Sequence, residues 1–247
     1  MDDLLHYIGG LPFVSENFDP HRLAGLTAFR RAQLARPPLE HFPDYLLPEV
    51  ARRIYAHRAR ELGLEFPLTA LTRDQSAAVR EVTTEIVAVM PTWAPLYELP
   101  REYLALEGDE TSATCALVPQ SIFLGQLAFG SRDTLLESVI HENAHLWLDL
   151  LIEVGDCQTK SDRTVYDLPS GTPNKTLTGV LLAAHFATTT RCFYLRRQRN
   201  SGDRRRGDYL SQYGARCLKR IAGRDGLTEL GKRVWQDLWN ALDGDRA

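Results

Sequence analysis

The first ninety residues read as helices separated by prolines, and within residues 73–89 apolar residues recur every three or four positions. Such spacing places apolar side chains on one face of a helix, which then packs against a core. The pattern predicts helices over residues 20–34, 47–62 and 72–89. The breaks between them fall at prolines, which lack the N–H that a helix interior requires: Pro37, Pro38, Pro43, Pro67 and Pro91. Residues 1–95 are therefore expected to form a helical scaffold.

The pattern changes after Pro100. Residues 114–118 and 121–124 are short apolar runs on either side of Pro119, and their length favours strands over helices. We therefore expect a small antiparallel β ribbon here, directly before the next helix.

A long helix is predicted from Ser131 to about Val154. Ser131 offers a side-chain oxygen as N-cap, Asp133 places negative charge in the first turn, and Gly155 follows the last apolar residue. The helix carries its own apolar side chains on nearly every face, which is typical of a helix in the protein interior.

The chain after this helix begins with a long polar stretch, residues 156–178. Its length and its content of proline and glycine are typical of an active-site loop rather than of a simple connection. Helices are expected to follow over residues 177–197, 209–221 and 227–242.

Together these patterns predict a mostly α-helical α+β fold, with the small antiparallel β ribbon preceding the long helix. We find no internal repeat and no low-complexity linker. The simplest partition is one catalytic domain over residues 1–247, with the scaffold over residues 1–95 and a metal-binding part over residues 96–247.

Composition excludes several classes of protein. The 247 residues are 44% apolar and 25% charged with a formal net charge of −3, so no global charge favours nucleic acid or an anionic membrane. No apolar stretch approaches the length of a membrane span, and the first six residues carry two acids instead of a basic signal, so we expect a cytoplasmic protein. Four cysteines lie far apart without a C-x-x-C pair, which argues against a disulfide framework and a zinc ribbon.

The long helix carries the sequence His141-Glu142-Asn143-Ala144-His145. Residues four apart lie one turn apart on the same face of a helix, so His141 and His145 can present both imidazoles to one metal ion, as in the zincin arrangement. The alternative is a pair of surface or core histidines that bind no metal. We favour the metal site, because polar side chains on an interior helix must be paired or bound to something.

A third protein ligand must come from another segment. Asp149 shares the face but lies roughly 12 Å along the helix from His141, too far to share an ion. His185 is the better candidate, because it lies in a second apolar helix where an unpaired imidazole is costly. A satisfied core histidine is the other interpretation of His185. The remaining candidates are carboxylates: Glu153, Asp156, Asp162 and Asp167.

One hypothesis is a zinc-dependent peptidase, in which Glu142 is the general base. The downstream sequence departs from the common versions of such enzymes. Leu148 and Leu151 occupy the positions where metzincins have glycine and histidine, and no glutamate lies between Glu153 and Glu229 to act as a gluzincin ligand.

A second hypothesis comes from a resemblance. The segment 135–197 resembles the HExxH-type proteins of ribosomal peptide natural-product pathways, a family of 2-oxoglutarate-dependent peptide β-hydroxylases. Besides the motif, four features are similar: Tyr166-Asp167-Leu168-Pro169-Ser170, Lys175 before Gly179, Ala184-His185-Phe186, and Leu227-Thr228-Glu229-Leu230-Gly231. The chain departs from the family in having Lys175-Thr176 where an Arg-Pro pair is expected.

The resemblance implies an enzyme that uses Fe(II) and 2-oxoglutarate to hydroxylate a side-chain β-carbon of a ribosomally made peptide. His141, His145 and His185, or two of them with a loop aspartate, would form the three-ligand face that such iron enzymes use. Lys175 with Thr176 would bind the distal carboxylate of 2-oxoglutarate, with Arg163 among the rivals. In that case Glu142 orients the metal site instead of acting as a base. Lys175 as a solvated loop residue is the competing interpretation.

The segment Arg196–Arg206 contains six arginines. It could bind an acidic leader of a precursor peptide, although a solvated loop between helices also explains such a run. Nucleic-acid binding lacks its companion features, such as an interleaved aromatic platform. A binding module with a purely structural metal is disfavoured, because structural zinc sites are usually cysteine-rich.

Overall fold

The computed structural model describes residues 4–64, 66–199 and 201–243. The chain divides into two compact units. Unit 1 combines Met1–Pro20 with Gly155–Ala247, and unit 2 is the continuous segment His21–Val154. The predicted division into a scaffold over residues 1–95 and a metal-binding part over residues 96–247 stays a prediction.

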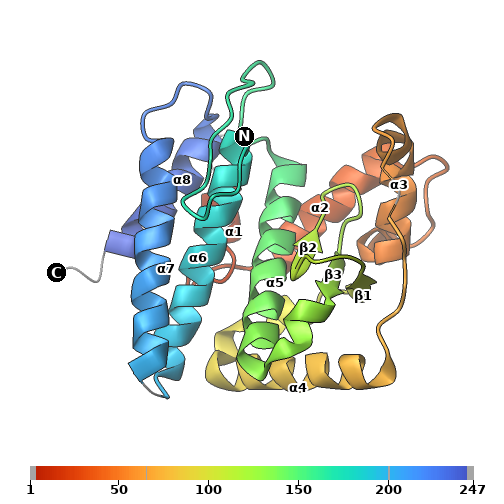
Figure 1. Ribbon diagram of the computed structural model, residues 1–247. Helices are drawn as coiled ribbons and strands as arrows, with labels where there is room; N and C mark the ends of the chain where they lie inside the picture. The colour runs from red at the N-terminus through yellow and green to blue at the C-terminus, as the bar shows by residue number, and fades with distance from the viewer. Residues whose placement is uncertain (1–3, 65, 200, 244–247) are drawn as a thin grey trace. The chain divides into compact units, whose positions relative to one another are not determined.

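Unit 2 consists of helices around a small sheet (Figure 1). Its α-helices are α2 (Pro20–Leu34), α3 (Pro48–Glu61), α4 (Arg73–Val89) and α5 (Arg132–Val154), and its 3₁₀ helices are η1 (Phe42–Leu46), η2 (Pro91–Tyr97) and η3 (Gln126–Gly130). Its strands are β1 (Glu102–Leu106), β2 (Ser112–Thr114) and β3 (Ser121–Gly125). The predicted helices agree with these bounds to within about one residue, which confirms a mostly α-helical α+β fold.

Local signals explain where the helices begin. Thr72 and Gln75 form a reciprocal capping box at the start of α4, with Gln75 N donating to Thr72 Oγ1 at 3.2 Å. Ser131 Oγ accepts a 3.1 Å hydrogen bond from Thr134 N, so the predicted N-cap of α5 is confirmed.

The sheet differs from the predicted antiparallel ribbon. Its strand order is β1-β3-β2, and only β2 and β3 are antiparallel, whereas β1 and β3 are parallel. The strand expected over residues 114–118 lies earlier, because Val118 N donates to Cys115 O in a turn before Pro119. The intervening β2 gives the chain enough length to return to β3 in the same direction as β1.

Buried apolar side chains form the core of unit 2. One cluster joins α2, η1 and α3 through Ala28, Tyr45 and Val50, and another lies under the sheet around Leu104 and Phe123. Helix α5 is buried over most of its length, as the apolar residues on nearly all of its faces predicted. Figure 1 shows α4 crossing one end of α5, against which it packs.

Unit 1 contains α1 (Leu4–Ile8), α6 (Leu177–Arg197), α7 (Ser201–Arg220) and α8 (Glu229–Asp243). Helices α6 and α7 pack along each other, and α8 contacts both (Figure 1). The prediction that the last helix pair begins at residue 209 is wrong, since α7 begins at Ser201. Asp203 explains the early start: its carboxylate accepts a 2.8 Å hydrogen bond from Arg199 N and pairs with Arg197.

The polar stretch between α5 and α6 is ordered by backbone pairing within unit 1. Tyr166 and Lys175 exchange two hydrogen bonds of 2.8 Å, and Leu168 N donates to Thr172 O around the turn between them. None of the helices in the described part of the chain combines the length and apolar character needed to cross a membrane.

Candidate metal centre

The two histidines of the motif meet on one face of α5. Their Nε2 atoms lie 2.8 Å apart, with the ring planes at 83° to each other. At this distance one ring donates its N–H to the other, so the accepting ring is neutral. Burial lowers the pKa of His141 to about 4, which keeps this ring neutral at pH 7. Neutral imidazole is the form that binds metal ions.

A divalent ion fits this pair by its chemistry. Imidazole nitrogen suits zinc and iron, and two nitrogens on one ion at bonds of about 2.1 Å lie about 3.4 Å apart in tetrahedral geometry. His141 and His145 therefore need only a small side-chain movement to share an ion.

Glu142 is 2% exposed and is held by the edge strand of the sheet. Its Oε1 accepts a 2.6 Å hydrogen bond from Ser112 Oγ. Its Oε2 is buried and has no hydrogen-bond partner within the described residues. One oxygen of a buried carboxylate is thus stabilised, while the other keeps its hydrogen-bonding capacity.

Asn143, at the centre of the motif, fastens α5 to the segment that includes β1. Its amide nitrogen donates to Val139 O at 2.7 Å and to Tyr103 Oη at 3.0 Å, and its oxygen accepts from Arg101. Trp147 adds a 3.0 Å hydrogen bond to Leu96 O. These contacts fix the orientation of α5 about its own axis.

Asp149 extends the acidic character of α5 beyond the motif. Burial, and then the nearby Glu142 and Glu153, raise the pKa of Asp149 to about 7. Two of these carboxylates have fixed donors, since Ser112 contacts Glu142 and Arg31 contacts Glu153. Asp149 accepts no hydrogen bond from the residues of the described ranges, so no donor offsets this rise.

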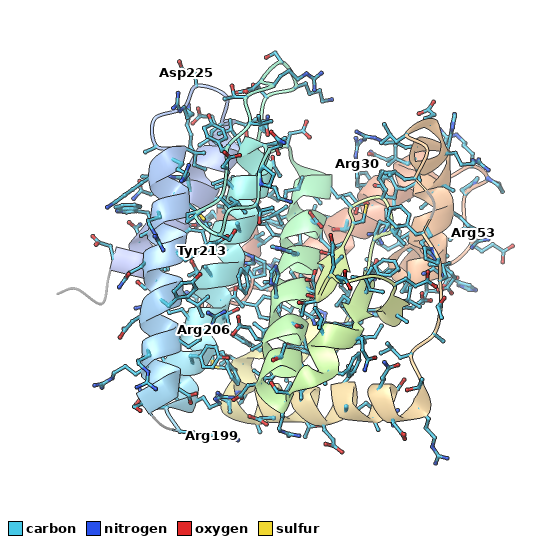
Figure 2. All side chains as sticks on the ribbon, in the orientation of Figure 1. Arg30, Arg53, Arg199, Arg206, Tyr213 and Asp225 are labelled. Carbon is cyan, nitrogen blue, oxygen red and sulfur yellow. The ribbon has the colours of Figure 1, made fainter. Side chains whose placement is uncertain are left out.

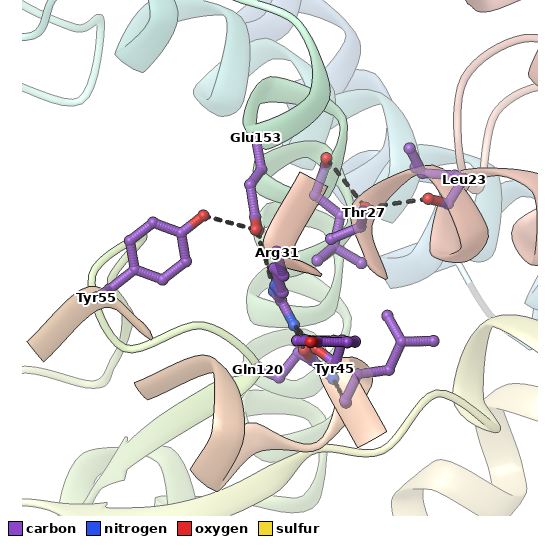
Figure 3. A network of polar contacts seen from close by, with 9 residues as sticks. Leu23, Thr27, Arg31, Tyr45, Tyr55, Gln120 and Glu153 are labelled. Carbon is purple, nitrogen blue, oxygen red and sulfur yellow. Dashed lines mark hydrogen bonds and ion pairs between the residues drawn. The ribbon is translucent and has the colours of Figure 1, made fainter. Parts of the chain in front are cut away.

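A buried ion pair anchors the last turn of α5 (Figure 3). Arg31 on α2 has a fully buried side chain and donates to both oxygens of Glu153, at 2.8 and 3.0 Å. Tyr55 Oη donates to the same carboxylate at 2.6 Å, and Arg31 also donates to Tyr45 O at 3.0 Å and to Gln120. Glu153 was one candidate for a metal ligand, but its carboxylate is occupied by these donors.

His185 lies on α6, in unit 1, whereas the histidine pair lies in unit 2. It is completely buried, and its Nε2 is 2.9 Å from Pro12 O. A carbonyl oxygen only accepts, so this nitrogen carries the proton and donates. Among the residues that the structure describes, no group of three His, Cys, Asp or Glu side chains is close enough to hold one ion. The third ligand stays a prediction.

The residues predicted to bind 2-oxoglutarate lie in unit 1 and are mostly exposed. Lys175 and Arg163 have exposed side chains. Thr176 is the N-cap of α6, where its Oγ1 accepts a 3.2 Å hydrogen bond from Gly179 N. Thr176 therefore has a structural role in starting this helix, and the binding roles of the three residues stay predictions.

The six arginines near the α6–α7 turn do not act alike. Figure 2 shows Arg199 near that turn and Arg206 farther along α7. The Arg197 side chain is 5% exposed and pairs with Asp203 at 2.6 Å. Its guanidinium carbon lies 4.9 Å from the ring centre of Tyr194, so this side chain holds the turn together. The arginines with exposed side chains are Arg196, Arg199, Arg204 and Arg205.

Two important side chains were not found from the sequence. Arg31 carried a signal, because a charged residue on the apolar stripe of a predicted helix is rarely buried without a partner. Ser112 carried none, since nothing in the chain connects it with Glu142, thirty residues later.

Comparison of the sequence with models of known protein families finds no match, and no curated protein matches it either.

Proposed function

We propose that this protein is a divalent-metal enzyme whose ion is held by His141 and His145. The observation that carries the proposal is the 2.8 Å approach of their Nε2 atoms on a largely buried helix. In the absence of an ion the two nitrogens satisfy each other as donor and acceptor, and the same convergence of neutral rings is what two histidine ligands of one ion require.

The reaction we propose is Fe(II)- and 2-oxoglutarate-dependent hydroxylation of a side-chain β-carbon in a ribosomally made peptide. The resemblance of residues 135–197 to the peptide hydroxylases supports it. When bound, Fe(II) with the co-substrate would supply the oxidation: one oxygen atom of O₂ enters the C–H bond, the other enters succinate, and CO₂ leaves.

The chain's own residues would supply binding and orientation. His141 and His145 would hold the ion, with His185 as the third ligand. Lys175 with Thr176, or else Arg163, would neutralise the distal carboxylate of 2-oxoglutarate. Glu142, fixed by Ser112, would accept a hydrogen bond at the metal site through Oε2. The exposed arginines around Arg199 would bind an acidic segment of the precursor peptide.

A second candidate function is zinc-dependent peptide hydrolysis. The observation that favours it is the buried Oε2 of Glu142, which has no hydrogen-bond donor among the described residues and is therefore suited to accept a proton from water. In that reaction Glu142 would be the general base, beside a zinc ion held by the same two histidines.

The test is anaerobic addition of Fe(II) and then 2-oxoglutarate to the metal-free protein, followed by visible absorption. The proposed hydroxylase should develop the charge-transfer band of a chelated 2-oxo acid. Absence of this band, together with tight stoichiometric binding of zinc, would refute the hydroxylase and favour hydrolysis.

Glu142→Gln separates the same two functions. Loss of activity with metal occupancy unchanged indicates general-base chemistry, whereas turnover that persists with Fe(II) and 2-oxoglutarate excludes the peptidase.

A further inference from the structure

Ser112 makes the only hydrogen bond that Glu142 receives on its carboxylate from the described residues. The distance from Ser112 Oγ to Glu142 Oε1 is 2.6 Å. The carboxylate has no proton to give when ionised, so the serine hydroxyl donates, and a bond of this length to a charged acceptor is among the stronger kinds. The bond joins the edge of the sheet to the centre of the motif.

The sheet holds Ser112 in a defined position. Ser112 lies in β2 opposite Leu124 of β3, and the next residue of β3, Gly125, donates its N–H to Thr111 O at 2.8 Å. A Cβ on Gly125 would lie 2.0 Å from Glu110 O. The chain therefore approaches β3 this closely only because residue 125 is glycine, and that approach sets where β2 begins.

Glu142 lies on α5 between the two histidines of the motif. Glu142 and His145 are three residues apart on α5, so their side chains are neighbours on the helix surface. A glutamate side chain has three rotatable bonds, and only a fixed rotamer keeps one chosen oxygen available beside the histidine pair. The donor on Oε1 provides that constraint.

We infer that Ser112 is a positioning residue of the metal centre, which holds Glu142 in one rotamer and reserves Oε2 for a ligand or substrate beside His141 and His145. This inference rests on the proposed metal site, but it holds for the oxidative and the hydrolytic reaction alike. It predicts that Ser112 affects the bound ion only through Glu142.

The experiment uses Co(II) alone, added to the metal-free full chain, because Co(II) binds imidazole sites and its visible absorption reports their geometry. Ser112→Ala should change the absorption of bound Co(II) in the wild-type background but not in Glu142→Ala, which has no side-chain acceptor for the serine hydroxyl. Ser112→Thr keeps the hydroxyl and should restore the wild-type spectrum. Thr114→Val is the matched control, because it removes a hydroxyl from the same face of β2 and should leave the spectrum unchanged.

A spectrum of Ser112→Ala identical to that of the wild type overturns the inference. So does a change of equal size in the Glu142→Ala background, because Ser112 would then act by another route. The Co(II) spectrum of the wild type should be lost in His141→Ala. If the two proteins bind Co(II) alike, or neither binds it, the proposed metal centre fails and the positioning role fails with it.

A metal-free measurement separates these failures. In urea unfolding, the cycle of Ser112→Ala and Glu142→Ala should show a coupling of about tenfold in the unfolding equilibrium constant, as for hydrogen bonds to ionised groups. The cycle with Thr114→Val should show none. A coupling below about twofold means that the hydrogen bond does not hold Glu142. That conclusion does not depend on whether the protein binds Co(II).

Discussion

Replacement of Glu153 by alanine tests the buried ion pair that anchors α5. The change removes both acceptors of Arg31, at 2.8 and 3.0 Å, and the acceptor of Tyr55 at 2.6 Å. The Arg31 side chain is fully buried, so among the described residues its charge would keep only Tyr45 O and Gln120 as partners. Breaking a buried pair from one side costs about 3–5 kcal/mol, because an uncompensated charge remains. That is a large part of the 5–15 kcal/mol typical of a whole domain.

Urea unfolding at pH 7, followed by circular dichroism, measures this loss. Glu81→Ala is the control, because Glu81 pairs with Arg132 on the surface at 3.4 Å and both side chains are more than half exposed. The control should lose less than about 1 kcal/mol. Replacing both partners, Arg31→Met with Glu153→Leu, should recover part of the loss, because no charge is left buried. A loss of less than 1 kcal/mol in Glu153→Ala would refute the anchoring role.

Three further predictions follow from single side chains. Gly125→Ala should destabilise the protein by about 1–3 kcal/mol in urea unfolding, since its Cβ would lie 2.0 Å from Glu110 O, whereas Gly130→Ala, with open space around it, should not. Thr72→Ala should cost about 1 kcal/mol through loss of the capping box of α4, and Thr72→Ser should restore most of it. Asp149 has its folded-state pKa raised to about 7, so the unfolded chain releases its proton first and stability falls as the pH rises from about 4 to 7. Asp149→Asn should remove that decline, and an unchanged pH profile would contradict the assigned pKa.

The helical part of the fold followed from the sequence because its signals are local. The bounds of α2 and α6 were predicted to the residue, and a proline, a serine or a threonine cap starts most of the others. The start of α7 was missed because Gly202 and a run of arginines resemble a loop. Asp203 lies among them in the first turn of α7, where its carboxylate accepts from Arg199 N and pairs with Arg197.

The sheet and the surroundings of the motif could not be predicted in the same way. The parallel pairing of β1 with β3 joins residues such as Glu102 and Ser121, and no local pattern shows which strands will be neighbours. The motif itself identified His141 and His145, and the structure shows that their Nε2 atoms lie close together. The side chains that hold this helix in place come from distant segments, so only the fold reveals them.

The most direct test of the metal centre is calorimetric titration of the metal-free protein with Zn(II), and with Fe(II) under anaerobic conditions. Wild-type protein should bind one ion, and His141→Ala and His145→Ala should each weaken binding at least a hundredfold. His57→Ala, which removes an exposed histidine on α3, should bind like the wild type. Equal affinity in the wild type and in His141→Ala would contradict the account, because the two converging imidazoles would then not be the ligands of an ion.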